Sequence, residues 1–85
     1  MKVNENLRNA IFEVIDNQVN ANDPVETATT LKRLMDEGSS EFEAKQYIGQ
    51  ALAVELFYVM KHKVPFNETR YINNLRNLPK EPSET

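Results

Sequence analysis

The sequence contains no cysteine and no tryptophan, and only two of its 85 residues are glycine. Without cysteine, the chain can form neither disulfides nor zinc sites built from thiolates. So few glycines argue against a turn-rich β-fold. No apolar run approaches the roughly 20 residues that a membrane span requires, and the first six residues lack the apolar core of a signal peptide. We therefore expect no membrane contact and, by default, a cytoplasmic location.

Residue patterns typical of catalysis or of nucleic-acid binding are also missing. The net charge is −3, and the densest basic stretch is Lys61-His62-Lys63, whose position at a predicted helix end suits the helix dipole better than a phosphate backbone. The serines fall at predicted caps or near the C-terminus, away from any base in sequence. Gly38 and Gly49 are too far apart for a phosphate-binding loop. We expect a protein that is not an enzyme, carries no cofactor and binds no nucleic acid.

The hydrophobic periodicity predicts an all-α fold. Apolar residues recur at helical spacing in four stretches that are separated by prolines, serines or a glycine. A chain of this length forms one domain, here predicted over residues 1–79, with residues 80–85 expected to be a disordered tail. Short connections predict antiparallel helix hairpins. The predicted helices of this small bundle span about residues 4–20, 24–37, 41–63 and 67–77.

Capping residues give the clearest helix boundaries. Asp23-Pro24 predicts a helix start with Asp23 as N-cap and Pro24 at the first helical position. Gly38 is placed to end that helix in a left-handed conformation. Ser40 and Glu43 have the spacing of a capping box, and Asn67 is predicted to cap the last helix.

Glu55 is the residue that does not fit its predicted surroundings. In the third predicted helix it falls near the middle of an apolar face. The other residues of this face are Ala44, Ile48, Ala51, Leu52 and Val59. A carboxylate on such a face needs a cation, a metal, a hydrogen-bond donor or a proton. Glu55 is therefore predicted to be the centre of a buried polar cluster.

Three interpretations of this cluster are open. In the first, Glu55 pairs with a cation from another helix, most directly Arg8 on the first helix. In the second, it accepts hydrogen bonds from polar side chains on facing helices, such as Gln18, Tyr58 or Tyr71. In the third, Glu55 and His62 take part in a metal site or a proton shuttle, although a spacing of two helical turns separates their origins by about 10 Å. The candidate cluster is Glu55, Arg8, Gln18, Tyr58 and His62.

Four segments of the chain, residues 17–24, 41–44, 53–57 and 65–71, resemble a family of small bacterial all-helical domains without assigned function. The Asn-Gln/Asp-Pro segment and the Pro-Phe-Asn/Arg-Tyr segment occur in the expected order and at plausible spacing. The resemblance implies a helical fold and brings no established activity. Relatives often carry histidines on the first helix that could join a glutamate matching Glu55 in a metal or polar cluster. This chain departs from that pattern, with Arg8 and Phe12 at the nearest positions.

The third predicted helix is apolar on more than one side, which favours a binding role. Phe57 and Met60 point away from the face that contains Glu55. A helix of this kind is either central in the fold or part of an oligomer interface. We therefore expect a protein-interaction module or a homodimer formed through this helix. The alternative is a small metal- or ligand-binding protein that uses Glu55 and His62.

Overall fold

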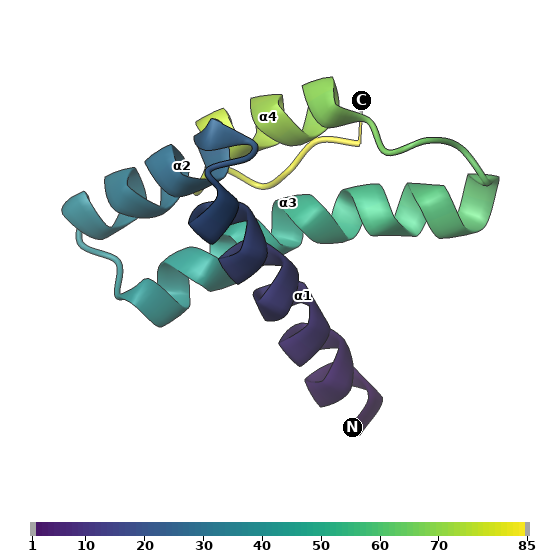
Figure 1. The fold of residues 1–85 in the computed structure, drawn as a ribbon, viewed down its shortest axis with the longest axis horizontal. Helices are drawn as coiled ribbons and strands as arrows, with labels where there is room; N and C mark the ends of the chain where they lie inside the picture. The colour runs from purple at the N-terminus through teal and green to yellow at the C-terminus, as the bar shows by residue number, and fades with distance from the viewer. Residues whose placement is uncertain (1, 85) are drawn as a thin grey trace.

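The computed structural model describes the backbone of residues 2–84 and the side chains of residues 5–84. Within these residues it contains four α-helices and no strand, so the predicted all-α fold is confirmed (Figure 1). No helix in this range combines the length and the apolar character that crossing a bilayer requires. The helices are α1 (Lys2–Ala21), α2 (Val25–Asp36), α3 (Glu41–His62) and α4 (Glu68–Asn77).

Most of the predicted caps are confirmed. The side chain of Ser40 accepts a hydrogen bond from the backbone N–H of Glu43, whose carboxylate accepts one from the N–H of Ser40, which completes the capping box. Gly38 has φ +113°, a conformation that L side chains rarely adopt. Asn67 caps α4 by accepting a hydrogen bond from the N–H of Arg70 at 3.0 Å. Local chemistry therefore determines three helix ends.

The predicted N-cap Asp23 is wrong. The N-cap of α2 is Pro24, and no side chain caps this end. Asp23 is still engaged in ending α1, because its N–H donates to the carbonyl of Gln18 while the N–H of Asn22 donates to Val19. With Asn22 at φ 55°, this is the same left-handed helix stop that glycine usually provides. Asparagine is the most common substitute for glycine there, and it brings α1 and α2 directly together.

The core lies where α3 packs against the three other helices. Its buried apolar residues come from every helix and from the turn after α4: Ile11, Ile15, Leu34, Ala44, Ile48, Ala51, Leu52, Tyr71, Leu75 and Leu78. In Figure 1, α3 runs back along α2 after a short turn, and α1 crosses this pair. Gly49 on α3 permits the crossing, since a Cβ atom there would lie 3.3 Å from Ile11 Cγ2. Gly49 is therefore a site of close helix packing.

Beyond the crossing, the N-terminal half of α1 projects away from the bundle (Figure 1). Residues 5–10 are all exposed, and Leu7 keeps 53% of its surface accessible. The protein exposes 5669 Å², whereas a monomer of its mass is expected to expose about 5,200 Å². The fold therefore leaves more surface uncovered than its size requires.

The chain after α4 is the segment expected to form a disordered tail, and part of it contacts α4. Residues 80–84 return along α4 in an extended path, and residue 85, like residue 1, lies outside the described part of the chain. The main chain of Ser83 is hydrogen-bonded to the side chain of Asn74 at both its N–H and its C=O. Proline and charge in this segment indicated disorder, but a buried amide on α4 supplies partners that composition alone does not reveal.

Candidate functional site

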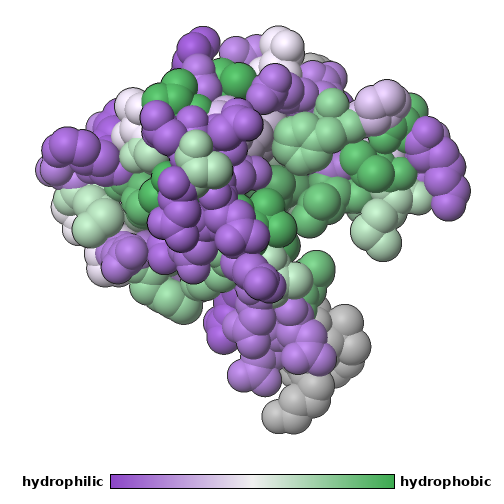
Figure 2. All heavy atoms as spheres, in the orientation of Figure 1, coloured by the Kyte–Doolittle hydropathy of each residue, from purple (hydrophilic) through white to green (hydrophobic). Residues whose placement is uncertain are grey.

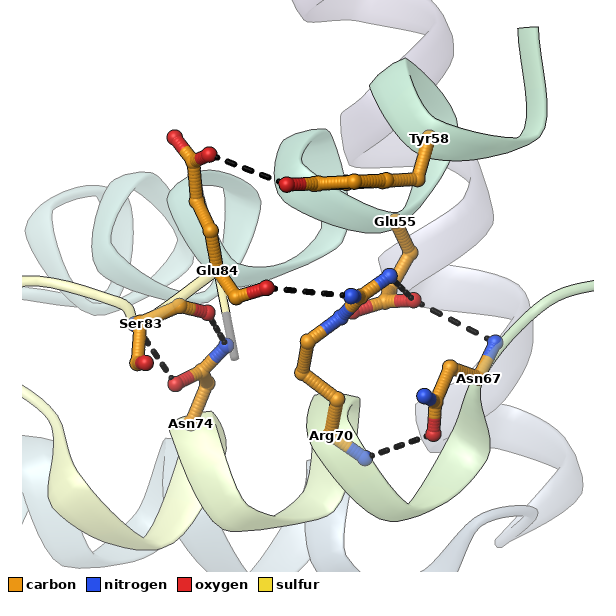
Figure 3. A network of polar contacts seen from close by, with 7 residues as sticks. All are labelled: Glu55, Tyr58, Asn67, Arg70, Asn74, Ser83 and Glu84. Carbon is orange, nitrogen blue, oxygen red and sulfur yellow. Dashed lines mark hydrogen bonds and ion pairs between the residues drawn. The ribbon is translucent and has the colours of Figure 1, made fainter. Parts of the chain in front are cut away.

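Glu55 is fully buried, and its carboxylate is completely satisfied (Figure 3). Arg70 Nε donates to Oε2 at 2.6 Å and Arg70 Nη2 to Oε1 at 2.9 Å. The backbone N–H of Asn67 donates to Oε1 at 3.2 Å. Two parallel bonds from a planar guanidinium give a strong and directional ion pair. The prediction that Glu55 turns inward is confirmed, and an ion pair is what satisfies it.

The start of α4 provides both partners of Glu55. Asn67 is the N-cap, so its side chain holds the N–H of Arg70 while its own N–H remains free to reach α3. Arg70 lies in the first turn and extends across to α3. One capping residue therefore fixes the helix end and the position of the cation.

Arg70 also connects Glu55 to the surface. Its guanidinium lies 4.3 Å from the ring centroid of Tyr58, a cation–π contact, and its Nη1 donates to the carbonyl of Glu84 at 3.2 Å. The Tyr58 hydroxyl donates to the Glu84 carboxylate at 3.1 Å. Hydrogen bonding to Glu55 raises the pKa of Arg70, and the bond to Glu84 raises the pKa of Tyr58. We call Glu55, Tyr58, Asn67, Arg70 and Glu84 the Glu55 cluster.

Arg8 is not the partner of Glu55. It is exposed, on the projecting half of α1, with its guanidinium 5.8 Å from the ring centroid of Phe42. The predicted pairing required the start of α1 to lie beside the later turns of α3. Beyond its crossing with α3 near Gly49, the N-terminal half of α1 projects away from the bundle, and Arg8 lies on this exposed part.

Gln18 belongs to a different polar cluster, which joins α1, α2 and α4. Its Oε1 accepts hydrogen bonds of 2.8 Å from both the Thr27 and the Tyr71 hydroxyls. Burial raises the pKa of Tyr71, while its hydrogen bonds to Thr27 and Gln18 act to lower it. The predicted bonds from Gln18 and Tyr71 to Glu55 are therefore wrong, because these residues satisfy one another.

The structure does not bring His62 and Glu55 together as metal ligands. His62 is exposed, and its ring packs on that of Tyr58 with centroids 5.0 Å apart. Both oxygens of Glu55 already accept hydrogen bonds from Arg70 and Asn67. Across residues 5–84, no three His, Asp or Glu side chains are grouped closely enough to hold a metal ion. Of the predicted cluster, only Glu55 and Tyr58 share a direct neighbour among the described residues, and that neighbour is Arg70.

Two adjoining hollows lie along α3, and the smaller one borders the Glu55 cluster at Tyr58 and Glu84. The larger, about 530 Å³, separates the projecting half of α1 from α3, and its walls include Leu7, Ile11 and Phe12. The smaller, about 260 Å³, continues along α3 past Val54 and Phe57. Gln50 and Ala53 line both. In Figure 2, apolar residues gather on α3 beside the crossing, above an indentation next to α1.

These two features, a satisfied ion-pair cluster and an open apolar face, are the candidate site. Sequence reasoning missed Arg70, Asn74 and Glu84. The short linker after α3 could have indicated Arg70, because the first turn of α4 must then lie near the last turns of α3. No family model, curated protein or solved structure matches this chain.

Proposed function

We propose that this chain is a non-enzymatic interaction module that binds through the outer face of α3. We define this α3 outer face as Ala53, Phe57 and Met60 together with the larger hollow beside Leu7. Its partner is a second copy of the chain. The observation that carries the proposal is the exposure of large apolar side chains on a helix whose opposite face forms the core.

The exposure is greatest at the C-terminal half of α3. Phe57 keeps 50% of its surface accessible and Met60 75%. Along the same stripe toward the N-terminus, Gly49 is covered by α1. Burying a large apolar side chain contributes about 1.5–3 kcal/mol. A partner on this face would therefore gain several such contributions from residues already held in place by the helix.

The rim of the larger hollow favours self-association. Arg8 on α1 and Glu43 on α3 both line it, and no ion pair joins them among the described residues. In a twofold dimer, if a residue of the first copy contacts a given residue of the second, the same contact is formed again with the two copies exchanged. Arg8 of each copy can then face Glu43 of the other, so the rim is complementary to itself.

Sedimentation velocity over a concentration series tests the proposal. We expect a reversible dimer, and Phe57→Ser should weaken it by at least about tenfold, because the substitution removes a buried aromatic contact of about 1.4 kcal/mol or more. Met35→Ser is the matched control, since Met35 is also exposed but lies on α2. A wild-type chain that stays monomeric up to about 0.5 mM would contradict the homodimer. An equal loss of dimer affinity in Met35→Ser would contradict it as well.

A further inference from the structure

The side chain of Asn74 is committed to the main chain of an extended segment. Asn74 is 3% exposed, on the face of α4 that carries Tyr71 and Leu75. Its Nδ2 donates to the carbonyl of Ser83 and its Oδ1 accepts from the N–H of Ser83, both at 2.8 Å. A side-chain amide used in this way reproduces the pairing that a neighbouring β-strand would offer. It recognises a peptide backbone without reading the side chain of the residue it holds.

The following residue is held through both its backbone and its side chain. The carbonyl of Glu84 accepts from Arg70 Nη1, and its carboxylate accepts from the Tyr58 hydroxyl. Arg70 is itself fixed by the buried Glu55 (Figure 3). Two successive residues of an extended chain thus meet three side chains of α3 and α4, and the second must carry an acceptor that reaches Tyr58.

An apolar hollow lies directly beside the bound carboxylate. Glu84 forms part of the wall of the smaller hollow, with Val54, Phe57 and Tyr58. In the described part of the chain, the segment from residue 80 onward offers this hollow no aliphatic or aromatic side chain beyond Pro82. The polar contacts are therefore made while the apolar contact beside them is left open.

The segment is held by these polar contacts rather than by burial. Ser83 and Glu84 are exposed, and Pro82 is only half-buried. A segment with few buried apolar contacts opens at low local free energy. The segment can therefore leave the helices while they stay folded, and another peptide can take its place.

We propose that the surface of α3 and α4 contacted by this segment is a binding site for an extended peptide of another protein, and that residues 82–84 occupy it in cis. The ligand places a backbone N–H and C=O on Asn74, then an acidic residue at Tyr58, then an apolar side chain in the hollow over Val54. The site differs from the α3 outer face in its anchor, Asn74, and in its ligand. Because Ala53 and Phe57 line the smaller hollow and also belong to the α3 outer face, the two sites are distinguished through Asn74, whose substitution should abolish peptide binding and leave self-association unchanged.

The test uses the full-length chain with Ser83→Pro, which removes the N–H that Oδ1 of Asn74 accepts and so weakens the cis contact. The probe is a dye-labelled peptide of sequence Lys-Glu-Pro-Ser-Glu-Leu, read by fluorescence anisotropy. We expect the substituted chain to bind it about tenfold more tightly than wild type, because a cis occupant lowers the apparent affinity by the fraction of open sites. A control peptide with proline in place of serine should bind neither chain.

Two further variants in the Ser83→Pro background assign the contacts. Asn74→Ala should abolish binding. Tyr58→Phe, which keeps the ring beside Arg70 but lacks the hydroxyl, should weaken binding of the probe and leave unchanged the binding of a peptide with alanine, which has no side-chain acceptor, in place of the second glutamate. Circular dichroism confirms that each variant is folded.

Three results would overturn the assignment. They are no binding to the Ser83→Pro chain, equal binding of the probe and the proline control, and binding that folded Asn74→Ala and Tyr58→Phe variants leave intact. Displacement of the probe from the Ser83→Pro chain by unlabelled wild-type chain would mean that the site binds residues 82–84 of a second copy. That result also contradicts a ligand from another protein.

Discussion

The guanidinium of Arg70 donates two hydrogen bonds, of 2.6 and 2.9 Å, to the carboxylate of Glu55 across the α3–α4 contact. Glu55 has no exposed surface, and the Arg70 side chain keeps 12%. The pair fixes how far α4 can slide along α3, because a shift of one residue would separate the two groups. An apolar contact at this position would tolerate such a shift.

Replacing Arg70 should expose the dependence of Glu55 on its partner. Arg70→Met leaves a buried carboxylate with only the N–H of Asn67, so we expect a loss of about 3 kcal/mol in the free energy of unfolding. Urea denaturation followed by circular dichroism measures it. Arg8→Met is the control, because Arg8 is exposed and should change stability by less than about 0.5 kcal/mol.

The pair can be separated from general damage by a double-mutant cycle. Glu55→Leu removes the carboxylate that makes Arg70→Met costly, so the double variant should be more stable than the sum of the single effects predicts, by about 1–3 kcal/mol. Additive effects would mean that the two residues stabilise the fold independently.

The cluster around Gln18 predicts a smaller effect. Tyr71→Phe removes one of two donors to Gln18 Oε1, while Thr27 still donates to that atom. Because no buried acceptor is left unpaired, we expect a cost of only about 1 kcal/mol. Gln18→Leu should cost more, since it leaves the hydroxyls of both Thr27 and Tyr71 without their acceptor. Equal losses in thermal unfolding would contradict this ranking.

Two of the left-handed helix stops, Gly38 and Asn22, predict different responses to substitution. Gly38→Ala places a Cβ atom at φ +113° and should destabilise by about 1–3 kcal/mol through backbone strain, although the space around it is open. Asn22→Gly relaxes a residue at φ 55° and should change stability by less than about 1 kcal/mol. Both are measured by urea denaturation, and a neutral Gly38→Ala would refute the strain at this turn.

The contact between Tyr58 and Glu84 should depend on pH. The pKa of Tyr58 is raised in the folded protein, mainly by the hydrogen bond to Glu84, while the charge of Arg70 acts to lower it. The contribution is therefore complete below about pH 10, the ordinary pKa of tyrosine, and is lost as the pH rises through the folded value. His62 also faces the ring of Tyr58.

NMR titration of the Tyr58 Cζ resonance measures this pKa directly. Glu84→Gln should lower it toward the ordinary value, because the amide no longer holds the proton on the phenol as the carboxylate does. A titration curve that is unchanged in Glu84→Gln would show that the contact is absent in solution.

Local sequence chemistry was enough to predict the four helices and most of their ends. Ser40, Gly38 and Asn67 act within one turn of their own positions, so no knowledge of packing was needed. Asp23 was assigned wrongly because two helix signals overlap, and the stop at Asn22 takes priority over the start. The inward position of Glu55 followed from periodicity alone.

The partners of Glu55 could not be predicted in the same way. They depend on how the other helices are placed around α3, and this placement depends on the close crossing of α1 at Gly49. The only sequence signal for that crossing is a glycine, which has no side chain. The tail contact at Asn74 likewise joins a buried amide to a segment with no periodicity. The resemblance to the bacterial helical family, the cytoplasmic location and the non-enzymatic role stay predictions.

The crossing at Gly49 divides α1 into two parts with different thermodynamic fates. Toward Ala21, its amides are shielded by the core and can exchange their hydrogens only when the whole protein unfolds. Toward Glu5, residues 5–10 of the same helix are exposed, so this part can melt and re-form while the remainder stays intact. A single continuous helix thus belongs partly to the cooperative unit and partly to a fraying arm, and the boundary lies near Ile11.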